Sequence, residues 1–341
     1  MVSYMNAPRF VGNGQIEWGK KEVPEPGPGQ LLVQVRANAL CGSDRHQFYQ
    51  GTDIVPGHEA SGVVVATGSG TTIEIGTPGV IFLMDFCGEC RNCRLGFTNL
   101  CLAKRADMGF NRDGGYGQYM LIHENIFFPI DADLPFVEAT MLLDIMGTGG
   151  HAINRARLVH PDIQSVIVSG AGPIGLGVLA MAKTLLGVDV PVFITDFAPY
   201  RLELAARLGG LPIDLAKGTL EDGLGTHGYE RIDVAIDTSG KASARQASLA
   251  VVAKPGALVC VGHGEGLTLD VSRDLIGTEH TVLGSEYFTF GELAGNLVHL
   301  RNDRDYFGQI ITHRFGVDEL QHAYELFFRG ETGKVVVQHD D

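Results

Sequence analysis

The segment "VSGAGPIGLG", residues 168–177, decides the expected fold of this chain. It carries the pattern G-x-G-x-x-G, preceded by the apolar run "SVIVSG" (165–170) and followed by an apolar helical pattern. In such a loop the first glycine makes a tight turn, the second lets the backbone approach a pyrophosphate, and the third allows close packing of helix on strand. The free N–H groups and the dipole of the helix N-terminus favour that anion. We therefore expect a dinucleotide to bind at Gly170, Gly172, Pro173, Ile174 and Gly175.

Strands and helices continue to alternate after this loop. The segments are "PVFITD" (191–196), a helix "PYRLELAARLGG" (199–210), "RIDVAIDTSG" (231–240), a helix through "ARQASLAVVAKPG" (244–256), "ALVCVG" (257–262) and "TVLGSE" (281–286). This alternation is typical of an α/β unit with a doubly wound parallel sheet. Asp196 ends a strand about 20 residues after the glycines, where a carboxylate binds the two ribose hydroxyls of a dinucleotide. Because a carboxylate repels a 2′-phosphate, Asp196 favours NAD over NADP.

The chain before residue 135 has a different pattern, with short apolar or alternating runs that predict β structure. A helical pattern starts at Pro135 and continues, with an interruption, toward residue 158. After about residue 285 the segments 290–300 and 317–330 predict helices, and "KVVVQ" (334–338) predicts an edge strand that returns to the first domain. A chain of 341 residues is long for one core. We expect domains at 1–146, 147–284 and 285–341, the last being part of the first.

Composition excludes several classes of partner. The net charge of −14 argues against nucleic acid and anionic membranes. The N-terminus lacks the pattern of a signal peptide. The most apolar stretch is broken by glycines and Lys183, so no membrane span is expected. We expect a cytoplasmic protein, in which the six cysteines stay reduced and serve metal binding or catalysis.

Four of these cysteines lie in "CGECRNCRLGFTNLC", within a lobe expected at 85–102. Cys87, Cys90, Cys93 and Cys101 follow the spacing C-x2-C-x2-C-x7-C. Four thiolates around one ion, with no open position, make a structural zinc site. An iron–sulfur cluster is the competing use, but the fourth cysteine is spaced differently from the ferredoxin run and no proline follows it.

A second candidate group is spread along the chain. "CGSDRH" (41–46) and "GHEASGVV" (57–64) offer Cys41, His58 and Glu59, and "LLDIMGTGG" (142–150) puts Asp144 in an apolar run. A buried carboxylate is costly unless it is paired or bound to a metal. From the residues alone, Asp144 is either a third ligand, a helix cap or a partner of an arginine, Arg155 or Arg157. Glu59 is the alternative third ligand.

Together these motifs resemble the zinc-dependent medium-chain dehydrogenase/reductase family, the alcohol and polyol dehydrogenases. The matching pieces are "CGSDRH", "GHEASG", the four-cysteine lobe, "DGGYGQYM", "GAGPIGLG", Asp196, "DTSG" and "GKVVV". The resemblance implies a GroES-like β-rich catalytic domain built from both chain ends, with a Rossmann domain inserted between them. It also implies one catalytic and one structural zinc, NAD as the cofactor, and a homodimer or homotetramer.

The resemblance implies roles for single residues. Cys41, His58 and Asp144 match the zinc ligands, Asp44 matches the carboxylate that orients His58, and Glu59 substitutes as a ligand when substrate leaves. Ser43 and His46 match a relay that carries the alcohol proton through the nicotinamide ribose to solvent. The residues expected to contact the cofactor, besides the glycine loop and Asp196, are Thr148, Arg201, Thr238 and Gly262. Arg201 is otherwise a helix-face arginine.

The expected reaction is hydride transfer from a polyol, sugar or related secondary alcohol to NAD⁺. Glu286 and Tyr287 in "GSEYFTF" (284–290), with Tyr119, are the polar candidates for contact with substrate. The alternatives are an L-threonine 3-dehydrogenase or an aminocyclitol dehydrogenase. A non-catalytic protein that binds zinc and NAD is the alternative from another class.

Overall fold

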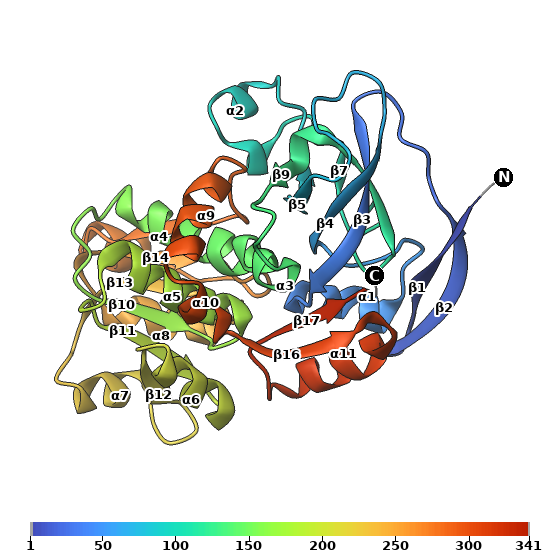
Figure 1. Cartoon of the computed structure of the whole chain (residues 1–341). Coiled ribbons are helices and arrows are strands. Elements are labelled where there is room, and N and C mark those ends of the chain that lie inside the picture. The colour runs from blue at the N-terminus through green and yellow to red at the C-terminus, as the bar shows by residue number, and fades with distance from the viewer. Residues whose placement is uncertain (1–2, 340–341) are drawn as a thin grey trace. The chain divides into compact units, whose positions relative to one another are not determined.

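The computed structural model describes residues 3–339, and the chain forms two compact units. Unit 1 comprises Met1–Leu143, Thr289–Arg304 and Ile311–Asp341, and unit 2 comprises Asp144–Phe288 and Asp305–Ile310. In Figure 1 the strands of unit 1 run from blue to green, with the red terminal strands β16 and β17 beside them. The domain limits expected from the sequence stay a prediction, since a compact unit is not by itself a domain.

Unit 2 contains a parallel sheet of six strands in the order β12-β11-β10-β13-β14-β15. Their bounds are β10 Val166–Ser169, β11 Val192–Asp196, β12 Leu211–Asp214, β13 Ile232–Asp237, β14 Val252–Cys260 and β15 Thr281–Gly284. Numbered from β10, this order is 3-2-1-4-5-6, the order of a doubly wound dinucleotide-binding fold. The strand order reverses between β10 and β13, and ligands of such sheets bind at the carboxyl ends of the strands there. The predicted fold class is confirmed.

The helices of unit 2 differ from the prediction in some of their limits and in number. Their bounds are η5 Asp144–Thr148, α4 Gly149–Arg157, α5 Pro173–Leu186, α6 Pro199–Arg207, α7 Leu220–Thr226, α8 Ala242–Val251 and η6 Val271–Ile276, and α10 Arg304–Gly308 follows at the return. The helix expected through residue 256 ends at Val251, and Val252 already begins β14. Pro255 explains this difference, because proline lacks the N–H of a helix interior and its ring clashes with the preceding turn. β12 and α7 were not predicted.

Glycines allow two helices of unit 2 to approach each other closely. The segment "LLDIMGTGG" enters a π-helical turn, η5, before α4 begins. A Cβ on Gly149 would lie 2.6 Å from the backbone of Gly177 in α5, and a Cβ on Gly177 would lie 2.4 Å from the carbonyl oxygen of Ile145. Since real Cβ atoms do not come this close to backbone, only glycine fits both positions. Gly149 and Gly177 therefore serve the packing of η5 and α4 on α5.

Unit 1 is built mainly from antiparallel strands, and β16 and β17 pair in parallel. β1 Tyr4–Gly12 and β2 Gln15–Glu22 form a hairpin, and β6 Met84–Asp85 pairs with β7 Ala106–Asp107. A larger sheet has the order β16-β17-β3-β4-β5-β9, with β8 also paired to β3. Its strands are β3 Gln30–Ala39, β4 Glu59–Thr67, β5 Pro78–Ile81, β8 Tyr119–His123, β9 Phe127–Pro129, β16 Ile311–Gly316 and β17 Lys334–Gln338. The prediction of an edge strand at 334–338 is wrong, because β17 lies between β16 and β3.

Short helices complete unit 1. They are η1 Gly42–Asp44, α1 Arg45–Gln50, α2 Arg91–Arg94, η2 Thr98–Leu100, η3 Glu124–Ile126, α3 Phe136–Ala139, η4 Thr140–Leu142, α9 Glu292–Asn302, η7 Val317–Glu319 and α11 Leu320–Arg329. In α11 the buried residues recur at helical spacing, at Leu320, Ala323, Tyr324 and Phe327. One face of α11 therefore enters the core of unit 1. Among residues 3–339, no helix is long and apolar enough to cross a membrane.

Candidate metal centres and nucleotide-binding loop

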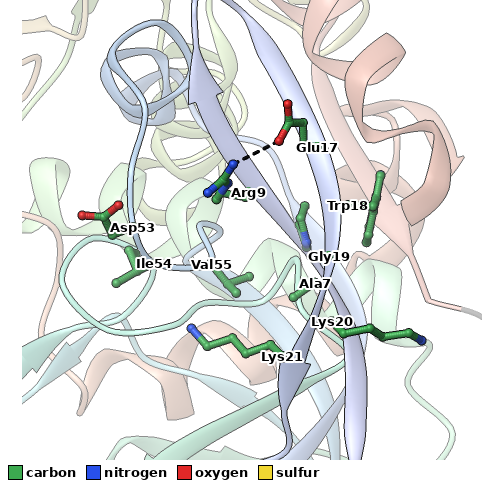
Figure 2. Close-up of a pocket in the computed structure, with 11 residues that line it drawn as sticks. Ala7, Arg9, Glu17, Trp18, Gly19, Lys20, Lys21, Asp53, Ile54 and Val55 are labelled. Atoms are coloured by element: carbon green, nitrogen blue, oxygen red, sulfur yellow. Dashed lines mark hydrogen bonds and ion pairs between the residues drawn. The ribbon is translucent and has the colours of Figure 1, made fainter.

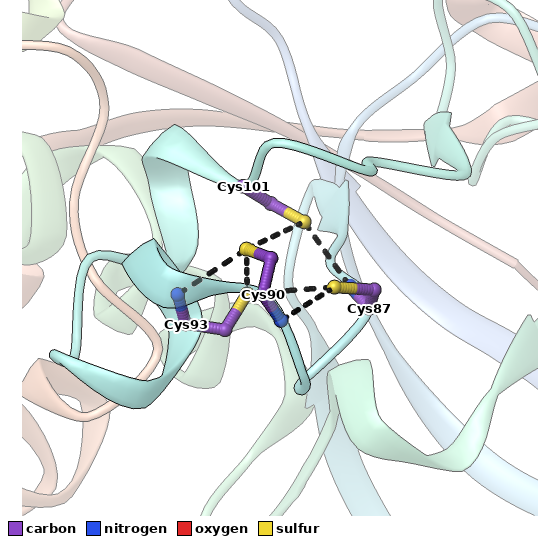
Figure 3. Close-up of side chains that lie close together, drawn as sticks. All are labelled: Cys87, Cys90, Cys93 and Cys101. Carbon is purple, nitrogen blue, oxygen red and sulfur yellow. Dashed lines mark hydrogen bonds between the residues drawn. The ribbon is translucent and has the colours of Figure 1, made fainter.

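The four cysteines of the predicted lobe lie together (Figure 3). Their Sγ atoms are 3.4 Å apart for Cys90 and Cys93, 3.9 Å for Cys90 and Cys101, and 4.0 Å for Cys87 and Cys93. Four sulfurs at the usual zinc–sulfur distance of about 2.3 Å are about 3.8 Å apart in a tetrahedron. All four thiols are free, at separations far beyond the roughly 2.05 Å of a disulfide. The group therefore fits a tetrahedral zinc ion.

Backbone N–H groups and burial shift the pKa values of the thiols in the lobe. The N–H groups of Cys93 and Leu102 lower the pKa of the Cys90 thiol to about 6, which favours its thiolate at neutral pH. Burial and the adjacent Cys90 raise the pKa of the Cys93 thiol to about 12. Thiols this crowded resist full deprotonation unless a cation balances their charge. A divalent metal supplies that balance, and zinc is the metal that four thiolates select in this geometry.

The buried carboxylate of Asp85 lies where the chain enters the lobe and binds two basic side chains. Asp85 accepts hydrogen bonds from Arg105, at 2.6 Å from Nη2, and its other oxygen lies 2.6 Å from Nδ1 of His123. Arg105 also donates to the carbonyl of Phe86 and to the side chain of Asn125. Asp85 and Phe86 begin the lobe and Arg105 follows it. These contacts therefore attach both ends of the lobe to His123 at the end of β8 and to Asn125 after it. They hold the lobe on unit 1 independently of its metal.

Cys41, His58, Glu59 and Asp144 form the second group. All four side chains are buried, and one ligand atom from each lies within 4.8 Å of every other. Cys41 follows the end of β3 and His58 precedes β4, and the last residue of β3, Ala39, pairs with Glu59 in register. This pairing brings Cys41 and His58 together although 17 positions separate them in the chain. A thiol, an imidazole and a carboxylate form a donor set that zinc accepts with a fourth position open.

Asp44 occupies the position expected of the residue that orients His58. It is fully buried, and its Oδ1 lies 3.2 Å from Nδ1 of His58. Its Oδ2 accepts from the backbone N–H of Cys41 at 3.2 Å and from the hydroxyls of Tyr324 at 2.6 Å and Tyr116 at 3.2 Å. Burial and the charge of Asp44 raise the pKa of both tyrosines well above the usual value, so both stay protonated. With Nδ1 of His58 directed at Asp44, Nε2 is the nitrogen left for a metal.

Glu59 has a partner that the sequence analysis did not identify. Its Oε1 forms an ion pair with Nζ of Lys334 on β17, and both side chains are fully buried. A buried ion pair of this kind keeps each charge in place only while the partner is present. "GKVVV" contained a signal, since a lysine in an apolar strand run needs a buried acid, but nothing in the sequence indicates which one.

The other predicted residues are placed as follows. Ser43 and His46 lie in η1 and α1 and are exposed, while Thr148 is buried at the end of η5. Glu286 follows β15 and lies 3.4 Å from the exposed His263, and Tyr287 has a positive φ of 46°. Tyr119 pairs with Gln34 in β3, five positions before Ala39. A contact of Tyr119 with substrate stays a prediction.

The glycine loop of unit 2 has the geometry that the pattern predicts. Gly170 has φ +99°, and a Cβ on Gly175 would lie 1.8 Å from the carbonyl oxygen of Gly170. A Cβ on Gly172, by contrast, would meet no atom nearer than Nη1 of Arg201, at 3.9 Å. The second glycine thus leaves its side open at the N-terminus of α5, where a pyrophosphate is expected. The residues of the loop therefore fit a dinucleotide.

Asp196 ends β11 and is tied to the glycine loop. Its Oδ2 accepts from the N–H of Ala171 at 2.9 Å, and its Oδ1 accepts from the N–H groups of Phe197 and Ala198. Arg201 lies 4.0 Å from the same Oδ2. Asp196 therefore orients the loop as well as presenting a carboxylate at the strand end.

A second buried pair holds the loops at the ends of β13 and β14. Asp237 accepts from Nε of Arg245 at 2.7 Å, and Arg245 also donates to the carbonyl of Gly262. The hydroxyl of Thr238 donates to the carbonyl of Gly170 at 3.1 Å. Thr238, which follows β13, is thus bonded directly to the glycine loop. Gly262, which follows β14, is linked through Arg245 to Asp237 at the end of β13. Both residues were predicted to contact the cofactor. Arg245 is a supporting residue that the sequence analysis missed.

A hollow of about 300 Å³ lies on unit 1 beside the hairpin of β1 and β2 (Figure 2). It is lined by the Arg9–Glu17 ion pair, Trp18 and the segment Asp53 to Val55. None of the proposed metal ligands lines it, so the hollow is separate from the metal centres.

Known proteins are similar to this chain over most of its length. The family description "Alcohol dehydrogenase GroES-like domain" matches residues 27–132, and "Zinc-binding dehydrogenase" matches residues 173–300. The zinc-type alcohol dehydrogenase-like protein YphC of Escherichia coli K12, itself uncharacterized, is 30% identical over 99% of this chain and 99% of its own. The L-threonine 3-dehydrogenase of Mesorhizobium japonicum is 33% identical over 92% of this chain and 93% of its own. The solved alcohol dehydrogenase TADH from Thermus sp. ATN1 is 26% identical, with a TM-score of 0.89 over 98% and 99% of the two chains.

The fold, the two metal groups and these matches define a zinc-dependent oxidoreductase. The chain belongs to the zinc-dependent medium-chain dehydrogenase/reductase family, among the alcohol and polyol dehydrogenases. The resemblance stated from the sequence is thereby confirmed, as are its GroES-like and Rossmann parts.

The lobe provides the first test. Replacing Cys90 by serine removes the sulfur that two backbone N–H groups and two thiols contact, so the Cys90→Ser variant is expected to lose the lobe zinc. We expect zinc content, measured by atomic emission, to fall from about two to about one per chain. Cys260→Ser is the matched control, since Cys260 is a half-buried thiol at the end of β14, outside the lobe. Retention of both zinc ions in Cys90→Ser would contradict the assignment.

Proposed function

We propose that this chain is an NAD-dependent dehydrogenase that takes a hydride from a secondary alcohol carrying further hydroxyl or amino groups. The observation that carries the proposal is the buried group of Cys41, His58 and Asp144, with Nδ1 of His58 directed at Asp44. A protein that only binds zinc needs no centre with an open position. We therefore favour catalysis over a binding role.

Asp144, rather than Glu59, is the proposed third ligand. Glu59 is neutralised by Lys334 inside the core, whereas the thiolate of Cys41 and the carboxylate of Asp144 together balance one divalent cation. A neutral His58 completes a ligand set with no net charge. Since an unbalanced charge is costly in a buried site, this division of charges leaves neither group unpaired.

The bound groups supply the bond chemistry: zinc lowers the pKa of a coordinated alcohol, and nicotinamide accepts the hydride. The residues of the chain do the rest. Asp44 keeps the proton of His58 on Nδ1, so that Nε2 stays available as a ligand. Ser43 in η1 and His46 in α1 are proposed to carry the alcohol proton to solvent, and both are exposed.

Asp196 is the basis for proposing NAD. Its carboxylate is held at the end of β11 by three backbone N–H groups and is directed to the side of the loop where the adenosine ribose is expected. Arg201, at 4.0 Å from Asp196, is paired with that carboxylate and is less free to attract a 2′-phosphate. Thr148, Thr238 and Gly262 are proposed to contact the cofactor as well.

The substrate class is proposed from the polar residues after β15. The carboxylate of Glu286 and the hydroxyl of Tyr287 suit a hydroxyl or ammonium group next to the reacting carbon. L-threonine is the second candidate, since its 3-hydroxyl is a secondary alcohol beside an amino group and a relative with 33% identity is an L-threonine 3-dehydrogenase.

A screen of NAD⁺ reduction tests the proposal. We expect turnover with at least one polyol, sugar or L-threonine, and little with simple apolar alcohols. A chelator that removes the catalytic zinc should abolish that turnover, and added zinc should restore it. Absence of turnover on every compound, with both zinc ions and NADH bound, would favour the non-catalytic alternative.

The choice of ligand is tested by two matched amide variants. We expect Asp144→Asn to retain only the lobe zinc, about one per chain, because an amide is a poor zinc ligand. Glu59→Gln alone would leave Lys334 buried and unbalanced. The double variant Glu59→Gln/Lys334→Met removes both charges and is therefore expected to keep about two zinc ions per chain. The reverse pattern would identify Glu59 as the ligand.

The role of Asp196 is tested by Asp196→Ala. Loss of a hydrogen bond to a charged group costs about 1.5–3 kcal/mol, so we expect NADH to bind about 10- to 100-fold more weakly. The Kd for NADPH should change less or fall, because the repulsion is gone. Asp214→Ala, at the end of the neighbouring β12, is the control and should leave both constants unchanged. An unchanged ratio of the two constants in Asp196→Ala would contradict the proposed preference.

A further inference from the structure

The hydroxyls of two tyrosines converge on Asp44 from distant parts of unit 1. We propose that Tyr116 and Tyr324 are positioning residues of the catalytic metal centre, which act through Asp44 on His58. The proposal rests on the proposed function, since it takes His58 to be a zinc ligand. It concerns residues outside the ligand group, one in the loop before β8 and one in α11.

Glycines bring Tyr116 to the metal centre. The N–H groups of Gly115 and Tyr116 donate to the carbonyls of Gly57 and Pro56, at 2.8 and 3.1 Å, so the loop lies along the segment that precedes His58. Gly57 has φ +96°, and a Cβ there would lie 2.8 Å from the ring of Tyr116. The glycines of "PGHE" and "DGGYG" thus make the space that the tyrosine ring fills.

Tyr324 arrives from the opposite end of the chain. It lies on the buried face of α11, where its ring packs 5.1 Å from that of Phe48 and 5.3 Å from that of Phe10. This aromatic cluster surrounds the hydroxyl with apolar groups. Inside it, a carboxylate needs internal donors, because a buried charge without them is costly.

The distances define the order of the hydrogen bonds. Each phenol carries one proton. Tyr324 donates its proton to Oδ2 of Asp44 at 2.6 Å, and its oxygen lies 2.7 Å from that of Tyr116. The hydroxyl of Tyr116 in turn donates to the same Oδ2, at 3.2 Å. If Tyr324 loses its hydroxyl, Tyr116 can still donate to Asp44.

This arrangement fixes the rotation of the Asp44 carboxylate. Oδ2 receives the hydroxyl of Tyr324 and the N–H of Cys41, so Oδ1 is left facing Nδ1 of His58. Outer partners of metal-ligating histidines fix the tautomer and the ring orientation and contribute to metal affinity. Without the two hydroxyls, Asp44 retains only the N–H of Cys41 to hold Oδ2 in place.

The test measures zinc release from the holoenzyme. Zinc transfer to a chromogenic chelator is followed for the wild type, Tyr324→Phe, Tyr116→Phe and the double variant. Cys90→Ser, which is expected to lack the lobe zinc, identifies the phase that belongs to the catalytic site. Tyr49→Phe is the matched control, since Tyr49 packs in the same aromatic cluster but is 41% exposed.

We expect each single variant to release catalytic zinc less than about tenfold faster, because the remaining hydroxyl still reaches Oδ2. The double variant should release it about 10- to 100-fold faster, more than the product of the two single effects. The lobe phase and Tyr49→Phe should match the wild type.

The outcomes separate this proposal from the function on which it rests. Catalytic zinc release at the wild-type rate in the double variant would overturn the proposal alone. Acceleration of both phases, together with a lower free energy of unfolding, would assign the tyrosines a purely structural role and overturn it too. A wild-type chain that binds only the lobe zinc would overturn the proposed function and, with it, this proposal.

Discussion

The buried carboxylate of Asp44 is the interaction on which the proposed catalytic centre depends. It joins β3, the segment before β4, the glycine loop of residues 114–117 and α11 at one point of unit 1. Each of its contacts satisfies a charge that is costly to bury, so the elements that carry the donors are held in one arrangement. His58 is thereby held with Nδ1 facing Oδ1 of Asp44. The neighbouring Glu59–Lys334 pair meets the same constraint with an ion pair.

Unit 2 depends on a steric constraint. A Cβ on Gly175, Gly149 or Gly177 would collide with backbone. The turn from Gly170 to Gly175 and the contact of Gly149 with Gly177 can therefore form only because these residues are glycines. These close approaches bring α5 onto the sheet and η5 onto α5. Asp196 then links the ends of β10 and β11 by hydrogen bonds, and the Asp237–Arg245 pair links those of β13 and β14.

Local patterns in the sequence were enough to predict the parts that local chemistry determines. The glycine loop and the four-cysteine spacing are each contained in about a dozen residues and need no information from elsewhere. The parallel, doubly wound sheet of unit 2 followed from the alternation of elements, whereas its strand order was not predicted. The helix at 244–256 was predicted too long because the apolar run continues past Val251, while Pro255 turns the chain into β14.

Long-range partners were beyond the reach of such patterns. Lys334 lies 275 positions from Glu59, and Tyr324 lies 280 positions from Asp44. The lysine in "GKVVV" signals that a buried acid lies nearby, but nothing in either local sequence indicates which residues form the pairs. The same lack of local signal explains the error at "KVVVQ", since only the pairing of β17 with both β16 and β3 shows that it is an interior strand.

The most direct test of this account is a crystal structure of the zinc-loaded protein, with anomalous data collected at the zinc edge. The account predicts a peak bonded to Sγ of Cys41, Nε2 of His58 and a carboxylate oxygen of Asp144. Glu59 should remain paired with Lys334, and Oδ1 of Asp44 should remain on Nδ1 of His58. A peak bonded to Glu59 in place of Asp144, or zinc found in the lobe alone, would contradict it.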